Sequence, residues 1–233
     1  MKKDLDQNGH YKKTQEFFDR SAAERGGLYD LRPDGKSQCS KHILVIRKKL
    51  SKIFEQLKTK NNLDVGCGNG DFFIELAKIY PNLNFTGVDF SGEMIRTAKN
   101  IAAGIKNIKF DVGDVLSLQF ADKFFDTVFC VNTLHHISPE DQRRAFKELA
   151  RVAGENVIVE IKNWDHPYHK YLRTGFGRYK INVQNQINVY PTTVKAVEAN
   201  MREFGFELVR VKPLWHFVFL SPFIVLHFKR IGV

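Results

Sequence analysis

The chain contains few cysteines and no long apolar run. Its 233 residues include three cysteines, Cys39, Cys67 and Cys130, and none of them forms a Cys-x-x-Cys pair. This pattern excludes a disulfide framework and a cysteine-based zinc site. No apolar run approaches the ~20 residues that span a bilayer, and the polar N-terminus lacks the apolar segment of a signal peptide. We therefore expect a soluble, cytoplasmic protein from a reducing compartment.

Acidic residues are outnumbered by basic ones, with 26 Asp and Glu against 36 Lys and Arg, which gives a net charge of +10. Such an excess favours an anionic partner, namely nucleic acid, an acidic membrane surface or a phosphorylated substrate. The basic residues are scattered, however, and this favours an ordinary solvated surface. No basic stripe and no added RNA-binding module is present, so nucleic acid is the less expected partner. The length suits one large domain, with or without a small appendage.

A glycine-rich segment at residues 61–70 organises the chain. It reads Asn-Asn-Leu-Asp-Val-Gly-Cys-Gly-Asn-Gly, and an amphipathic run follows at residues 71–80. The pattern predicts a short strand, a turn and a helix. Glycine lacks a Cβ and allows a ligand to lie against the main chain, and a helix N-terminus offers unpaired N–H groups. The segment therefore predicts a site for a nucleotide-like ligand.

An acidic residue follows at the distance that a ribose site requires. The dinucleotide fingerprint Gly-x-Gly-x-x-Gly has a carboxylate about 20 residues further on for the ribose hydroxyls. Here Asp89 ends a predicted strand at 84–89, but Asp71 stands where that fingerprint has its third glycine. The ribose carboxylate is present, whereas the glycine spacing differs from that of dinucleotide-binding proteins.

Two motifs together resemble a known family. Residues 63–70, Leu-Asp-Val-Gly-Cys-Gly-Asn-Gly, and residues 87–94, Gly-Val-Asp-Phe-Ser-Gly-Glu-Met, resemble the first and second motifs of class I S-adenosylmethionine-dependent methyltransferases. The resemblance covers about residues 40–163 and is strongest to the quinone-biosynthesis and small-molecule enzymes. It implies S-adenosyl-L-methionine as cofactor, with an acidic residue at the position of Asp114 accepting a hydrogen bond from the adenine amino group. The cofactor-binding residues that it implies are Asp64, Gly66, Cys67, Gly68, Gly70, Asp89, Phe90, Met94, Asp114, Val115 and Asn132.

Helical and strand patterns alternate along the chain, which predicts βαβ units and a parallel sheet. The first predicted strand is short and ends with Leu63 and Val65. The other predicted strands lie at 84–89, 108–112, 124–131, 156–162, 206–212 and 224–229, and the predicted helices at 40–57, 71–80, 91–103, 138–150 and 191–204. The last two strands are expected to form an antiparallel pair. The resemblance implies an α/β, Rossmann-like, doubly wound fold, with a mostly parallel seven-stranded sheet, an antiparallel last strand and helices on both faces. The cofactor segments all follow strand ends, so we expect them to meet at one sheet edge.

The two ends of the resemblance carry the candidates for substrate binding. We expect residues 1–39 to form an N-terminal lid, with a mobile first ten residues and a short helix at 11–19. Residues 40–233 would form the methyltransferase domain, with an insertion at about 164–191. The candidate substrate-binding residues are Tyr11, Phe18, Tyr29, His166, Tyr168 and His169. For the aromatic residues of the lid, anchoring a terminal helix to the core is an equally good interpretation.

A histidine pair, His135 and His136, follows the fourth predicted strand. Histidine is the natural base near neutral pH, and an oxygen acceptor benefits from a base. We expect one of the two to be catalytic, with His166 and His169 as rivals. No carboxylate or cysteine cluster completes a metal site, so we expect no metal. The segment Asn132-Thr-Leu-His also lacks the Asn/Asp-Pro-Pro-Tyr/Phe motif of the members that methylate exocyclic base amines.

These observations favour methyl transfer to an oxygen, or a carbon, of a small-molecule or lipid-like substrate. The alternatives are an RNA or protein methyltransferase and a non-catalytic cofactor-binding partner protein. Residues 214–223 are unusually apolar. We expect them to form strand core, with an exposed patch that makes a peripheral membrane contact as the alternative. Nothing in the sequence indicates an oligomeric state.

Overall fold

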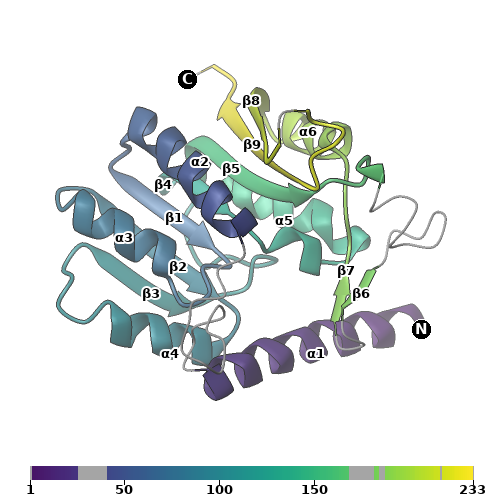
Figure 1. The fold of residues 1–233 in the computed structure, drawn as a ribbon, viewed down its shortest axis with the longest axis horizontal. Coiled ribbons are helices and arrows are strands. Elements are labelled where there is room, and N and C mark those ends of the chain that lie inside the picture. Colours follow the sequence, from purple (N-terminus) through teal and green to yellow (C-terminus); the bar gives the residue numbers. More distant parts are fainter. Residues whose placement is uncertain (1, 26–40, 168–180, 184–186, 216, 233) are drawn as a thin grey trace.

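The computed structural model describes residues 2–25, 41–167, 181–183, 187–215 and 217–232. A seven-stranded sheet has the order β3-β2-β1-β4-β5-β9-β8 (Figure 1). Its strands are β1 (Asn61–Val65), β2 (Asn84–Asp89), β3 (Ile108–Val112), β4 (Phe125–Cys130), β5 (Ala153–Lys162), β8 (Phe206–Pro213) and β9 (Phe223–Arg230). Strands β1 to β5 are parallel, and β9 runs antiparallel to both β5 and β8. The predicted sheet, including its antiparallel last strand, is confirmed.

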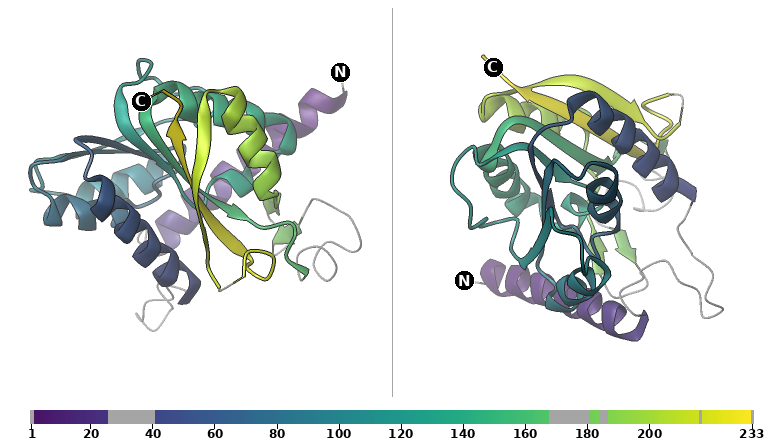
Figure 2. Two further views of the ribbon diagram at one scale, coloured as in Figure 1. Left: turned by 90° about the horizontal axis from the view of Figure 1, so that it is seen from above. Right: turned by 90° about the vertical axis from the view of Figure 1, so that its left-hand side faces the viewer.

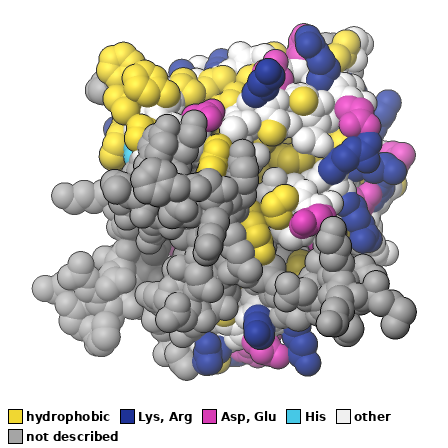
Figure 3. All heavy atoms as spheres, turned by 90° about the vertical axis from the view of Figure 1, so that its right-hand side faces the viewer, with side chains coloured by type: hydrophobic (Ala, Val, Ile, Leu, Met, Phe, Trp, Pro, Cys, Tyr) yellow, Lys and Arg dark blue, Asp and Glu magenta, His cyan; other side chains and the backbone are white. Residues whose placement is uncertain are grey.

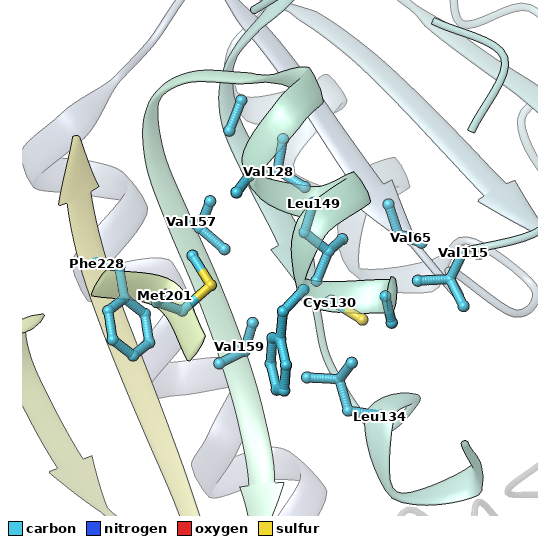
Figure 4. Close-up of a cluster of buried hydrophobic side chains, with 14 of the residues drawn as sticks. Val65, Val115, Val128, Cys130, Leu134, Leu149, Val157, Val159, Met201 and Phe228 are labelled. Atoms are coloured by element: carbon cyan, nitrogen blue, oxygen red, sulfur yellow. The ribbon is translucent and has the colours of Figure 1, made fainter. Parts of the chain in front are cut away.

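Helices cover both faces of this sheet, as predicted. They are α2 (Lys41–Leu57), α3 (Asp71–Ile79), α4 (Gly92–Ile101), α5 (Pro139–Val152) and α6 (Val194–Glu203). Buried residues of α2, α3 and α4 belong to one apolar cluster, and those of α5 and α6 belong to another. Figure 4 shows part of the second cluster, with Leu149 of α5 and Met201 of α6 beside Val128 and Val157 of the central strands. Burial on both faces explains why these strands are nearly continuous apolar runs.

The N-terminal helix α1 (Lys2–Arg25) is much longer than predicted. We expected a short helix at 11–19, whereas the helix extends over Lys2–Arg25. The expected mobility of the first ten residues stays a prediction. The helix lies across the end of the sheet where the parallel strands finish, alongside α4 (Figures 1 and 2). Gln15 Nε2 donates to the Phe90 carbonyl at 2.8 Å, and Ser91 Oγ donates to Asp19. Tertiary contacts of this kind stabilise a helix whose own sequence only weakly favours helix formation.

The region expected to be an insertion contains a hairpin that the sequence did not reveal. Strands β6 (Ile181–Val183) and β7 (Ile187–Val189) pair antiparallel. Directly after β7, the Tyr190 N–H donates to the His135 carbonyl at 2.7 Å. The chain beyond β7 is thus attached to the turn that follows β4.

The connection between β8 and β9 contradicts the expectation of strand core. Phe217 and Phe219 are 61% and 59% exposed and Trp215 is 56% exposed, and hydrophobic side chains gather at the upper left of Figure 3. Polar contacts hold this connection instead: Asn163 Nδ2 donates to the carbonyls of Val218 and Ser221. A run of consecutive apolar residues has the same pattern whether it is buried or exposed, so the sequence could not separate the two cases.

Candidate functional site

The glycine turn between β1 and α3 is fastened to the end of β2. The N–H groups of Gly66 and Cys67 both donate to the Val88 carbonyl, at 2.7 and 3.0 Å, and the Gly68 N–H donates to Asp89 Oδ2 at 2.9 Å. Gly66, Gly68 and Gly70 all have positive φ, at 76°, 56° and 76°. A Cβ on Gly66 would lie 2.0 Å from Thr133 Oγ1, whereas one on Gly68 would meet nothing within 4 Å. The turn therefore packs tightly on its inner side and presents bare backbone to open space beside Asp89.

Two buried carboxyl groups flank this turn. Asp64 and Asp89 are 6% and 7% exposed. Burial raises the pKa of Asp89 to about 6, although backbone N–H groups of Ser91 and Gly68 donate to it and lower that pKa. Burial and the neighbouring Asp89 charge raise the pKa of Asp64 to about 7, and Arg47 offsets part of the shift. Each carboxylate oxygen can accept more than one hydrogen bond, so Asp89 retains the capacity to bind a ribose diol.

Helix α1 closes over the third carboxylate of this edge. Tyr11 donates its hydroxyl to Asp114 Oδ1 at 2.7 Å, and the Leu116 N–H donates to the same oxygen at 2.8 Å. Burial, together with Asp114, raises the pKa of Tyr11. The Tyr11 ring also contacts the Phe90 ring edge-on, with 5.4 Å between centroids. Within the described chain, Asp114 Oδ2 has no hydrogen-bond partner, so it is the oxygen that an adenine amino group would use.

The histidine pair lies in the short helix η1 (Leu134–His136), directly after β4. His135 is 4% exposed, and its ring centroid lies 4.3 Å from that of His136. The His136 ring meets the Phe18 ring of α1 edge-on, at 5.2 Å. His136 is the more accessible of the two, and it faces the helix that covers the site.

Sequence reasoning missed Glu160, which lies beneath this pair. Its Oε2 lies 4.0 Å from His135 Nδ1 and accepts the Asn132 N–H at 3.0 Å. Asn132 has a φ of 60°, an unusual conformation for a residue other than glycine. The only signal in the sequence was a single carboxylate within an apolar strand.

The other predicted residues fall into three groups. Met94 and Val115, which follow Asp89 and Asp114 in sequence, are both buried. His166 is buried, and its ring centroid lies 6.0 Å from that of Trp215 in the β8–β9 connection. Three further candidates for substrate binding lie outside the described residues, namely Tyr29, Tyr168 and His169.

Neither a metal cluster nor a membrane span is found in the parts of the chain that the structure describes. No three His, Cys, Asp or Glu side chains there are arranged to hold a metal ion. No helix there is long and apolar enough to cross a membrane.

Comparison with known proteins gives partial matches along the sequence and a nearly complete match in fold. Residues 63–156 match a family profile described as "Methyltransferase domain". Ajmaline N-methyltransferase of Rauvolfia serpentina is 33% identical over 112 residues, which are 47% of this chain and 38% of that protein. Demethylmenaquinone methyltransferase of Staphylococcus aureus strain JH9 is 38% identical over 146 residues, 58% of this chain and 60% of that protein. The chain thus spans less than two thirds of the length of these curated relatives.

Among solved structures, magnesium protoporphyrin IX methyltransferase of Synechocystis PCC 6803 with bound SAH superimposes with a TM-score of 0.67. The match covers 93% of this chain and 98% of that one at 19% identity, so it supports the fold alone. The sequence profile lies over β1 to β5, which carry the glycine turn, Asp89, Asp114 and the histidine pair. Residues 63–156 thus match a methyltransferase domain, and the chain has the fold of the magnesium protoporphyrin IX methyltransferase.

Proposed function

We propose that this chain transfers a methyl group from S-adenosylmethionine to an oxygen, or a carbon, of a small apolar molecule. The observation that supports it is convergence: the glycine turn, Asp89, Asp114 and the histidine pair all follow carboxyl ends of neighbouring strands. The cofactor supplies an electrophilic methyl group together with its own leaving group. The protein must hold the two reactants in line and exclude water, and orientation alone contributes roughly 7–11 kcal/mol.

Each part of this edge has a role in holding the cofactor. The open backbone at Gly68 allows close approach of the ligand, and Asp89 accepts hydrogen bonds from the ribose hydroxyls. Asp114 accepts from the adenine amino group, with Tyr11 closing over it. The residues present therefore fit an adenosine-containing ligand.

The acceptor is expected to bind beside the contact between His136 and Phe18 of α1. Phe18 and Phe90 contact each other with 5.9 Å between ring centroids, and Phe18 also contacts His136. Aromatic walls suit a flat, apolar molecule. His136 would take the proton of an acceptor hydroxyl, which raises the nucleophilicity of that oxygen, or of a ring carbon conjugated to it. One relative is named for methylation of a nitrogen. The identity of the acceptor atom in this protein therefore has to be measured.

The exposed apolar residues of the β8–β9 connection suit contact with an anionic lipid surface. The large apolar side chains of this connection are more than a third exposed, namely those of Trp215, Phe217, Val218, Phe219 and Leu220. They lie beyond the carboxyl end of β5, the edge that carries the site. The net charge of +10 complements anionic lipids, and exposed Lys212 lies next to the connection. We propose that this connection rests on an anionic bilayer, from which an apolar substrate reaches the site directly.

Asp89→Asn is expected to weaken S-adenosylhomocysteine binding about 10- to 100-fold, because hydrogen bonds to an ionised group contribute about 1.5–3 kcal/mol. Isothermal titration calorimetry measures this loss. Asp122→Asn, a surface carboxylate paired with Arg151, is the matched control and should bind normally. Equal affinities of Asp89→Asn and parent protein would contradict the proposal that Asp89 binds the ribose hydroxyls.

The affinity for S-adenosylmethionine is expected to rise about tenfold or more between pH 5.5 and 7.5. The reason is that Asp89 and Asp64, with pKa values of about 6 and about 7, ionise in this range and attract the sulfonium. S-adenosylhomocysteine lacks that charge, so its affinity should rise less. Asp64→Asn should reduce the difference between the two ligands, and His136→Asn should not. Identical pH profiles for both ligands would contradict this account.

The activity itself is tested with isotopically labelled S-adenosylmethionine and a cell extract. Mass spectrometry should detect a small apolar metabolite that gains one labelled methyl group, and fragmentation identifies the acceptor atom. At a cofactor concentration below saturation, Asp89→Asn protein should form about 10- to 100-fold less product, in line with its loss of affinity. Label in RNA or protein instead would favour the macromolecular alternatives, and no labelled product despite cofactor binding would favour a non-catalytic partner protein.

Phe217→Ser/Phe219→Ser protein is expected to sediment with phosphatidylserine-containing vesicles at least about tenfold less than the parent protein, since burying one such ring contributes about 1.5–3 kcal/mol. Ile79→Ser/Phe124→Ser is the matched control, because both residues are 58% exposed and lie at the opposite edge. Parent protein that fails to bind, or a double variant that binds equally well, would refute the membrane contact.

A further inference from the structure

Glu160 is a carboxyl group in a place where charge is costly. It lies in β5, between β4 and β9 in the middle of the sheet, and is 0% exposed. Removing a carboxylate from water costs several kcal/mol unless it is well paired. Oε2 accepts the Asn132 N–H, but Oε1 has no hydrogen-bond partner. A neutral side chain would be cheaper here for stability alone, so the position calls for another explanation.

The surroundings of this carboxyl group supply one. The titratable groups around Glu160 are His135 of η1, Lys162 on its own strand and the Cys130 thiol on β4. Its antiparallel partner on β9 is the apolar Val225. His135 can carry a positive charge, lies within 4.0 Å of Glu160 Oε2 and is itself buried.

The contacts continue outward from this carboxyl group in a fixed order. Glu160 Oε2 lies 4.0 Å from His135 Nδ1, the two histidine rings lie 4.3 Å apart between centroids, and His136 meets Phe18 of α1 at 5.2 Å. The backbone of His135 is also fixed, because its carbonyl accepts the Tyr190 N–H. The series begins inside the sheet and ends beneath the helix that covers the site.

We propose that Glu160 is a positioning residue for the histidine pair: acting through His135, its carboxylate sets the charge and orientation of His136 under α1. This inference rests on the proposed role of His136 as base. When the acceptor gives its proton to a ring nitrogen of His136, the imidazolium carries a positive charge. The Glu160 carboxylate offsets that charge through His135, so the three side chains are electrostatically coupled.

Burial raises the pKa of the Glu160 carboxyl group, while Lys162 and the Asn132 N–H lower it in part. A carboxylate within about 4–6 Å raises a histidine pKa by about 1–3 units. Because two adjacent imidazolium ions repel each other, the histidine pair holds its first proton far more readily than its second. The protonation of the pair is therefore expected to be coupled to the charge of Glu160.

A simpler role for Glu160 would be to anchor the left-handed backbone of Asn132. Glu160→Gln separates the two roles, because the glutamine amide oxygen still accepts the Asn132 N–H but carries no charge. Glu148→Gln is a matched control elsewhere in the fold: Glu148 also accepts a backbone N–H, from Leu118 at 2.9 Å, but its charged partner is Arg151.

The test is a pH titration by NMR of protein labelled with ¹³C at histidine Cε1, with His135 and His136 assigned by single His→Asn variants. Glu160→Gln should lower the first pKa of the pair by about 1–3 units, and Glu148→Gln should leave it unchanged. Unchanged pKa values in folded Glu160→Gln protein would overturn the proposal and leave only the anchoring role.

A second measurement needs no substitution at Glu160. In parent protein labelled with ¹³C at glutamate Cδ, the Glu160 carboxyl signal should show a titration step at the midpoint of the His135 signal. Independent midpoints would also overturn the proposal. Both measurements use the protein without cofactor or substrate, so their outcome is separate from that of the labelled-methyl experiment.

Discussion

The hydrogen bond from the Gly68 N–H to Asp89 Oδ2 is the contact on which the site depends. It joins the turn after β1 to the end of β2 and gives the buried carboxylate a donor. The two further bonds from the turn to the Val88 carbonyl make the junction rigid. Because Gly66 packs against Thr133 of the segment after β4, the same turn also fixes the approach to the histidine pair. The glycine turn and the segment that carries the histidine pair therefore share one support.

The second constraint is electrostatic. Asp64, Asp89 and Glu160 are nearly or fully buried at one edge of a protein whose net charge is +10. Burial raises the pKa of each of these carboxyl groups, which means that the folded protein binds protons more readily than the unfolded chain. Their contribution to stability is therefore greatest at acid pH and is lost as the pH rises through about 4 to 7. Carboxyl groups that cost stability when ionised are typical of a site arranged for a cationic ligand or a proton.

The parallel strands and their helices could be predicted from the sequence because their apolar spacing is decided locally. Ser91 caps α4 by accepting the Met94 N–H. The carboxylates were predictable because strand ends bring them to one edge. By contrast, α1 depends on contacts of Gln15 and Asp19 with residues more than 70 positions away, which no local pattern contains.

Two other features needed the structure for a different reason. The exposed rings of Phe217 and Phe219 belong to a run whose composition equally suits a buried strand. Glu160 resembles an ordinary strand residue until its distance to His135 is known. In both cases the sequence showed the residue type, and the fold decided its surroundings. Residues that matter for function but break a local rule are the ones that sequence patterns miss most readily.

The central claim is that this sheet edge binds an adenosine through its glycine turn and two aspartates. A crystal structure of the chain grown with S-adenosylhomocysteine tests it most directly. The account predicts ribose hydroxyls on Asp89, the adenine amino group on Asp114 and the sulfur on the side of His136, beneath α1. A turn that stays empty at saturating ligand, or one that instead takes up a nicotinamide dinucleotide, would contradict it.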